Sequence, residues 1–298
     1  MLDKQKVKVG ISPLTWSNDQ RPEIGENIPF EQCISEMALT GYVGTEIGRK
    51  YPTDPVILRN MLDLRELQVC NAFFSSLLTI RDYEEAEYYF IKKRDFLYTL
   101  GAKIVGVCEL GLAVMDYPDV NIFEEKPIFS DEQWDNMTAG LNKLGKLAEE
   151  KGMCVAFHHH MSTGVQTMDE IDRLMEMTNP ELVHLLYDTG HLVIADVDCL
   201  EVLEKYIHRI KHIHLKDIRK DIFEKAKKDG YSFLDCVDEG VFTVPGDGMI
   251  DFEPLFDFLG KNNYEGWIVV EAEQYPEKAN PFVYAKKARE YIYDVAGI

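Results

Sequence analysis

The sequence predicts an α/β protein, a single-domain (β/α)8 barrel over residues 1–298. Three observations favour this fold. Eight short apolar segments alternate with longer amphipathic segments. The apolar segments are rich in Val and Ile and nearly continuous, as expected of strands that are covered on both faces. Polar side chains suited to chemistry gather where the last four of these segments end, which is where barrel enzymes place their sites.

The expected strands are spaced so that a helix fits between each pair. They are VKVGIS (7–12), GTEIG (44–48), QVCNAFF (68–74), KIVGVCE (103–109), MCVAFHH (153–159), LVHLLYD (182–188), IKHIHLK (210–216) and GWIVVEA (266–272). A doubly wound open sheet is the alternative architecture. Such a fold usually has a glycine-rich phosphate loop after its first strand, and the stretch GISPLTW does not have that pattern.

Capping residues and glycines mark the expected helix boundaries. Asp54 followed by Pro55 is typical of an N-cap with proline at the first helical position. The stretches SDEQ (130–133) and TMDE (167–170) have the capping-box pattern, and the last helix is expected over 281–297. Glycines are expected to end three helices, at Gly101, Gly152 and Gly260.

Two long connections follow expected strand ends, at residues 110–129 and 217–248. Because barrel active sites lie at the carboxyl ends of the strands, we expect these connections to form walls or lids over a site.

Composition excludes several classes of function. The net charge of −20 opposes binding to nucleic acid or to an anionic membrane. No apolar run reaches the roughly 18 residues of a membrane span, and the charged start MLDKQKVKVG does not have the pattern of a signal peptide. Six cysteines without a CxxC pair are typical of reduced thiols. We therefore expect a cytoplasmic protein that acts on a small molecule, and the sequence leaves open whether identical chains form an oligomer.

The last four expected strands each end in side chains that bind metal ions. The groups are His158, His159 and His160 on the fifth strand, Asp188 and then His191 on the sixth, His212, His214 and Lys216 on the seventh, and Glu271 and Glu273 on the eighth. Because these strands are neighbours in a barrel, the groups are expected to converge. A mixed imidazole and carboxylate set suits Co²⁺, Mn²⁺, Fe²⁺ or Zn²⁺ better than Mg²⁺ or Ca²⁺.

Strand alternation sorts these groups between two faces. His158 and His160 share a face, and His159 is expected to point the other way, toward the helices. Away from the rim, His184 and His208 are expected to be structural, and His212 to be a core group or a group behind the ligands. The residues alone leave open which triplet histidine binds metal.

Four motifs resemble the xylose isomerase-like barrel superfamily, which includes sugar isomerases, ketose epimerases and endonuclease IV-type enzymes. They are LLYDTGH, HIHLKD, GWIVVEAE and VPGDGMIDF. The resemblance implies four metal ligands and a substrate-binding role for His191. The implied ligands are His158, where the superfamily has glutamate, and Asp188, His214 and Glu271.

A closer resemblance, over nearly the whole length, is to the inosose dehydratase family. It is carried by GISPLTWSND, GYVGTEIG, FHHHMSTG and GWIVVEAEQ. This resemblance implies dehydration of a cyclic polyol ketone, 2-keto-myo-inositol (scyllo-inosose), to a trihydroxycyclohexane-dione during inositol catabolism. It also implies Co²⁺ or Mn²⁺ as the metal, with Zn²⁺ or Fe²⁺ as alternatives, and glutathione as a further cofactor.

The imidazole on strand five removes the pair of opposed carboxylates that epimerases of the superfamily use, and so favours a dehydratase. Proton transfer is expected from Lys216, whose pKa a bound cation could lower, or from His191, Glu273 or Glu46. Lys216 pairing with Glu273 is an equal alternative. Substrate contacts are expected from four residues: Trp16, Asn18, Asp19 and His160.

Three alternative functions remain open at this point. A sugar isomerase or epimerase on the same metal-binding barrel is the nearest. A hydrolase of the apurinic-site nuclease type is disfavoured by the acidic charge and by the lack of extra ligands for a trinuclear cluster. A non-catalytic sugar-binding protein is the last.

Overall fold

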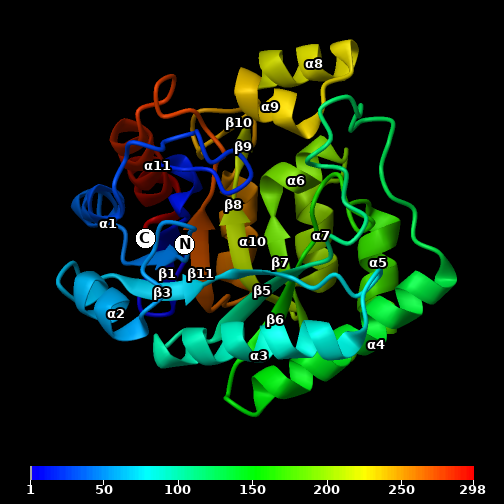
Figure 1. Ribbon diagram of the computed structural model, residues 1–298. Coiled ribbons are helices and arrows are strands. Elements are labelled where there is room, and N and C mark those ends of the chain that lie inside the picture. The colour runs from blue at the N-terminus through cyan, green and yellow to red at the C-terminus, as the bar shows by residue number, and fades with distance from the viewer. Residues whose placement is uncertain (1) are drawn as a thin grey trace.

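The computed structural model describes residues 2–298 and confirms the barrel (Figure 1). The strands form one parallel sheet in the order β3-β2-β1-β11-β8-β7-β6-β5-β4. Their bounds are β1 Val7–Ile11, β2 Gly44–Glu46, β3 Gln68–Asn71, β4 Phe73–Ser75, β5 Ile104–Cys108, β6 Cys154–His158, β7 Val183–Asp188, β8 Ile210–Leu215 and β11 Gly266–Val270. All eight expected strands are present.

The third expected strand differs in one respect, because it is divided at Ala72 into β3 and β4. β3 pairs with β2 and β4 pairs with β5, so this single run of chain joins the two ends of the sheet order. The break lets one stretch of chain serve both neighbours as the sheet curves into a barrel.

Helices surround the barrel (Figure 1). They are η1 Pro13–Thr15, α1 Phe30–Leu39, α2 Pro55–Asp63, α3 Tyr83–Thr99, α4 Asp131–Glu149, α5 Met168–Met177, α6 Thr189–Ile194, α7 Cys199–Tyr206, α8 Lys220–Asp229, α9 Phe233–Glu239, α10 Glu253–Lys261 and α11 Pro281–Ala296. No helix within residues 2–298 combines the length and apolar character that crossing a membrane requires.

The expected helix starts are confirmed by their caps. Asp54 accepts hydrogen bonds from the first turn of α2, and the capping boxes of α4 and α5 are both formed. Gly101 and Gly152 follow α3 and α4 with positive φ. The expectation for Gly260 is wrong, because α10 continues to Lys261 and the reversal occurs at Asn263, with φ of 54°. Asparagine tolerates this left-handed conformation better than most residues with a side chain.

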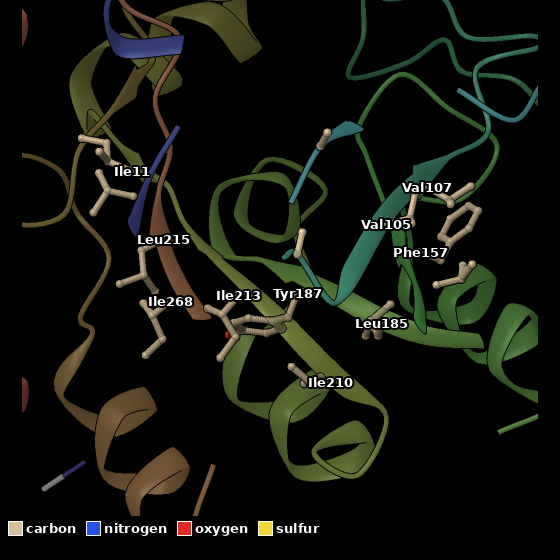
Figure 2. Close-up of a cluster of buried hydrophobic side chains, with 14 of the residues drawn as sticks. Ile11, Val105, Val107, Phe157, Leu185, Tyr187, Ile210, Ile213, Leu215 and Ile268 are labelled. Atoms are coloured by element: carbon tan, nitrogen blue, oxygen red, sulfur yellow. The ribbon is translucent and has the colours of Figure 1, made fainter. Parts of the chain in front are cut away.

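The main core lies between the barrel and its helices. Figure 2 shows buried side chains of this layer, several of which come from strand positions one residue away from the polar rim groups. They include Phe157 on β6, Tyr187 on β7 and Ile213 on β8, each at most 1% exposed. Since neighbouring strand positions face opposite sides, packing these residues outward turns the residue on either side of each into the barrel.

The two long connections cover the carboxyl ends of the strands, as expected. The connection after β8 folds into α8, α9 and a small antiparallel pair, β9 Asp217–Ile218 with β10 Phe242–Thr243. It forms a second apolar core with the loop after β5, through buried residues such as Met115, Ile122 and Phe233. Figure 1 shows α8 and α9 at this end of the barrel. These segments therefore roof the strand ends.

Candidate metal centre and cavity

Strand register brings the predicted metal-binding groups together at one end of the barrel. Asp188 on β7 lies directly beside His214 on β8, and His158 on β6 lies beside the β7 residue Leu186. On β11, Val269 pairs with His214, so Glu271 follows two positions closer to the rim on the same face. The convergence that the sequence predicted is therefore a consequence of parallel pairing in this register.

A cavity of about 260 Å³ opens at this rim. Apolar side chains of Phe73, Leu110 and Met115 form part of its wall. The polar residues that line it are Ser12, Asp19, Gln20, Glu46, Asn71, His158, His160, His214, Glu271 and Glu273. A mainly apolar wall with convergent polar groups is the usual construction of a site for a small molecule.

Three side chains, those of His158, Asp188 and His214, bring ligand atoms close together, and Glu271 lies beside them. Nε2 of His158 lies 3.4 Å from Oδ2 of Asp188, and Nδ1 of His214 lies 3.4 Å from the same oxygen. Nδ1 of His214 is also 3.3 Å from Oε2 of Glu271. Within residues 2–298, no hydrogen-bond partner satisfies the buried His158 Nε2, Asp188 Oδ2 or His214 Nδ1. Buried polar atoms are normally paired, so this unsatisfied set fits a divalent cation.

The charges around this point show how strongly a cation is favoured. Burial alone would disfavour ionised carboxylates, but Lys216 and His191 hold the pKa of Asp188 well below its usual range. His214 and Lys216 likewise lower the pKa of Glu271 to about 2 despite burial. Despite its own burial, His214 has a pKa raised well above the usual value by Glu271 and Glu46. These opposing shifts show that the carboxylates favour a positive charge beside them.

Lys216 lies behind the cavity wall among carboxylates. Its Nζ is 2.9 Å from Oε1 of Glu271, 2.9 Å from Oε1 of Glu273 and 3.8 Å from Oδ2 of Asp188. Burial would lower its pKa, but the three carboxylates outweigh burial and raise the pKa above the usual value. Lys216 is fully buried and paired with Glu273, which is the alternative role given to it above. That a bound metal ion lowers the pKa of Lys216 stays a prediction.

The small residue Gly190 makes this burial feasible. A Cβ at that position would lie 2.5 Å from Cγ of Lys216. Lys216 also donates a hydrogen bond to Nε2 of His191, at 3.1 Å. The stretch YDTGH thus supplies a carboxylate, the space for the lysine and its imidazole partner. His191 and Lys216 are both completely buried, so they lie behind the cavity surface.

The three histidines of the triplet have three different surroundings. His158 faces Asp188 and His214, as described above. His159 points away from them, and its Nε2 accepts a hydrogen bond from the Asp188 backbone N–H at 3.1 Å. His160 lines the cavity and its ring lies 3.7 Å, centroid to centroid, from that of His191. His158 and His160 therefore face the cavity and His159 faces the other side of the strand, as alternation predicts.

Glu46 lies at the cavity wall but is engaged by three side chains. Its Oε1 is 2.9 Å from Nε2 of His214 and 3.0 Å from Nε2 of His212, and it accepts a hydrogen bond from Nδ2 of Asn71 at 2.8 Å. Burial opposes ionisation of Glu46, but His214 and His212 lower its pKa well below the usual value. His212 is completely buried, and the expectation that it lies outside the ligand set stays a prediction.

In the loop after β1, Trp16 and Asn18 do not line the cavity, contrary to the expectation that they contact substrate. Trp16 is 1% exposed, and its indole Nε1 donates to Oε2 of Glu36 on α1 at 2.6 Å, so it is a core residue. Asn18 is also 1% exposed, and its Oδ1 accepts the backbone N–H groups of Gln20 and Arg21. Asn18 therefore shapes the turn. Its neighbour Asp19 does line the cavity.

Asn71 and Gln20 are cavity residues that sequence reasoning missed. Asn71 is a polar residue inside an apolar strand, and that mismatch is the signal that could have identified it. Gln20 lies in a loop, where no periodicity indicates direction. Its Nε2 lies 3.0 Å from Sδ of Met115, so it connects the loop after β1 to the loop after β5 across the cavity.

Comparison with known proteins identifies the family of the chain. The xylose isomerase-like TIM barrel family matches residues 58–295. An inosose dehydratase of Clostridium tetani is 57% identical over 298 residues, with all of both chains covered. The chain belongs to the inosose dehydratase family. A second inosose dehydratase, of Clostridium beijerinckii, is also 57% identical over the full length of both chains.

The fold of this inosose dehydratase family member is shared with more distant barrels. The solved structure of the IOLI protein with a bound zinc atom superposes with a TM-score of 0.70 at 19% identity, covering 97% of this chain and 98% of that chain. At this identity the likeness concerns the fold.

Proposed function

We propose that this chain is an inosose dehydratase, a carbon–oxygen lyase that removes water from scyllo-inosose to give a trihydroxycyclohexane-dione. Full-length identity of 57% to two inosose dehydratases supports this assignment. The structural observation that carries it is the convergence of unsatisfied ligand atoms from His158, Asp188 and His214, with Glu271 beside them.

We further propose that those four residues hold one divalent ion. Asp188 and Glu271 supply two negative charges, and the two imidazoles bind in their neutral form. An ion bound there would polarise the ketone oxygen and stabilise negative charge that develops on it. The donor set is compatible with Co²⁺ or Mn²⁺, and Zn²⁺ and Fe²⁺ suit the same mixture of nitrogen and oxygen ligands.

Elimination of water requires removal of the proton beside the ketone and departure of a hydroxyl group. Glu273 lines the cavity, and burial raises its pKa, with Glu271 adding to the effect and Lys216 opposing it. A carboxylate with a raised pKa is a better base near neutral pH. We assign proton removal to Glu273, which Lys216 holds in place at 2.9 Å. His160 and Asp19 are placed to contact substrate hydroxyls from the cavity wall.

The cellular compartment, the binding partners and the oligomeric state are further proposals. Six free cysteines are compatible with a reducing compartment, and we propose that the enzyme is cytoplasmic. The net charge of −20 supports a small-molecule partner over nucleic acid or an anionic membrane. Glutathione binding and assembly into a homo-oligomer stay predictions, which calorimetric titration and analytical ultracentrifugation would test.

The assay for this proposal uses the purified chain loaded with Mn²⁺ or Co²⁺. Turnover of scyllo-inosose should give a dione that absorbs in the near ultraviolet, and chelation should abolish the product. A panel of ketoses is the control, because an isomerase or epimerase would interconvert them without forming a dione. A metal-loaded chain that turns over ketoses but forms no dione would contradict the proposed function.

A further inference from the structure

His214 has its two ring nitrogens in different environments. Nδ1 faces Asp188 and Glu271, at 3.4 and 3.3 Å from their carboxylate oxygens. Nε2 lies 2.9 Å from Oε1 of Glu46, on the opposite side of the ring. A ring that binds a cation through Nδ1 must carry its proton on Nε2 and donate it to Glu46. Glu46 therefore lies on the side of the ring away from the other ligand atoms.

We propose that Glu46 is a positioning residue of the metal site, which fixes the tautomer and orientation of His214 and makes its Nδ1 a stronger ligand. The inference rests on the proposed ligand set and assigns Glu46 no direct part in proton transfer. Carboxylates that accept the outer N–H of a metal-bound imidazole act in this way.

Neighbouring side chains fix the orientation of the Glu46 carboxylate toward His214. The structure shows three donor groups at Oε1: His214, His212 and Asn71. With three short contacts this oxygen has little freedom to turn toward a substrate. His212 adds a second N–H from two positions back on β8 and so fixes the carboxylate relative to the same strand that carries His214.

Asn71 is itself held by the barrel backbone. Glu46 and Asn71 are paired positions of β2 and β3. Oδ1 of Asn71 accepts the backbone N–H of Gly106 on β5 at 2.6 Å, across the gap where the third strand divides. A Cβ at Gly106 would lie 2.6 Å from Nδ2 of Asn71, so a larger residue there would displace the Asn71 amide from this bridge. A chain of contacts thus runs from the β5 backbone through Asn71 and Glu46 to His214.

Two rival roles for Glu46 make different predictions. Glu46, His212 and His214 are close enough to hold a second cation themselves. Glu46 also lines the cavity and could transfer a proton directly. A second cation would give two bound ions per chain, whereas a proton-transfer role would leave metal affinity unchanged and reduce kcat.

The first experiment measures Mn²⁺ affinity and stoichiometry of wild type and Glu46→Gln by competition with a chelator. We expect one ion per chain in both, with affinity lowered about 10- to 100-fold in the variant. His212→Asn should still bind one ion. Two ions in wild type, with one lost in either variant, would overturn the positioning role in favour of a second site.

Glu109→Gln is the matched control. Glu109 is also a buried glutamate near a strand end, but its carboxylate accepts hydrogen bonds from Thr79 and the Leu78 backbone N–H. This variant should lose stability with metal affinity unchanged. If it weakens Mn²⁺ binding as much as Glu46→Gln does, the effect of Glu46 is general loss of structure and the proposal is overturned.

Activity at saturating metal separates positioning from proton transfer. Glu46→Gln should recover most of its kcat when Mn²⁺ is raised, with an unchanged pH profile. A fall of about 10²- to 10⁴-fold that excess metal does not restore, with unaltered affinity, would identify Glu46 as a proton-transfer group. The visible spectrum of the Co²⁺-loaded variant should also shift, because the strength of His214 as a ligand to Co²⁺ changes.

A wild-type measurement covers the case in which Glu46→Gln does not fold. Nitrogen-15 NMR of the Zn²⁺-loaded protein should show His214 protonated at Nε2 and bound through Nδ1. The reverse tautomer would overturn the proposal. The Mn²⁺ affinity and the NMR spectrum are both measured without substrate. A chain that binds metal through Nδ1 of His214 but forms no dione would therefore contradict the proposed function and leave the role of Glu46 intact.

Discussion

Nε2 of His158 lies 3.4 Å from Oδ2 of Asp188, and neither buried atom has a hydrogen-bond partner within residues 2–298. Leaving such atoms unsatisfied costs about 1–3 kcal/mol each, and more for a charged oxygen. Parallel pairing of β6 and β7 and the turn into α6 hold both atoms in this position. A metal ion bound by both atoms would remove this cost.

Removal of any one anionic or imidazole ligand should release the metal. Asp188→Ala, His214→Ala and Glu271→Ala should each abolish Mn²⁺ or Co²⁺ binding and activity, because one of four ligands is lost and the charge balance changes. Circular dichroism should show an intact barrel, and elemental analysis should show the missing ion. Full metal content in any two of these variants would disprove the ligand assignment.

The histidine triplet should separate metal binding from stability. His159→Gln should destabilise the fold while metal content is retained, because His159 accepts the Asp188 backbone N–H and faces away from the ligands. His158→Gln should lose metal. Denaturation midpoints and metal content measured together check both expectations, and loss of metal from His159→Gln alone would show that the assignment within the triplet is shifted by one residue.

Lys216→Met should destabilise the metal-free protein more than the metal-loaded protein. Lys216 is the buried cation nearest to Glu271 and Glu273, and removal of one partner from a buried ion pair typically costs about 3–5 kcal/mol. A bound divalent ion would compensate part of that lost charge. Urea denaturation with and without Mn²⁺ measures the difference, and equal destabilisation in both states would argue against a cation at this point.

The fold could be predicted from the sequence because parallel strands leave a strong apolar pattern and capping residues mark helix starts. The convergence of histidine and carboxylate side chains at one rim could be predicted because alternation and strand order determine which groups share a face. The choice of four ligands among them stays a prediction that the family resemblance implies. The division of the third strand at Ala72 could not be predicted, because curvature of the closed sheet leaves no local signal in the sequence.

The environment of each side chain was also beyond the sequence. Trp16 and Asn18 lie in a loop, where no periodicity shows whether a residue faces a cavity or the core. The pKa of Lys216 depends on three carboxylates, one at the end of β7 and two in the residues that follow β11. The contact between Glu46 and His214 joins β2 to β8, which are not neighbours in the sheet. Such contacts depend on side-chain direction across the barrel interior.

Stability should fall as the pH is lowered below about 6.5. Burial lowers the pKa of His159 to about 3 and the pKa of His184 to about 4. Below pH 6.5, which is about the pKa of histidine in the unfolded chain, the unfolded chain takes up protons that the folded chain does not. The contribution of each histidine to the free energy of unfolding is therefore complete above that pH and is lost as the pH falls toward the pKa of the folded state.

His184→Gln isolates one of these groups, because His184 lies toward the opposite end of β7 from Asp188. Urea denaturation at pH 7.5 and 5.5 should show that wild type loses about 1 kcal/mol more stability than this variant between the two values. Identical pH dependence in both proteins would show that His184 is not held neutral.

His158→Glu should retain metal but lose dehydration. A third carboxylate makes the ligand set more negative and the ion a weaker Lewis acid, so kcat should fall roughly tenfold or more, for a loss of about 1.4 kcal/mol of transition-state stabilisation. Dione absorbance measures this loss. Deuterium uptake into scyllo-inosose should persist or increase, since removal of the proton beside the ketone does not need the hydroxyl to leave. Unchanged dehydration would show that the charge of His158 is immaterial.

We predict that His158, Asp188, His214 and Glu271 hold a single catalytic ion. An anomalous-scattering map from crystals grown with Mn²⁺ or Co²⁺ tests it most directly. We predict one peak, about 2.0–2.2 Å from His158 Nε2, Asp188 Oδ2, His214 Nδ1 and a Glu271 oxygen. A peak bound instead by Glu46, His212 and His214 Nε2, or no peak at the four-residue site in active protein, would contradict the account.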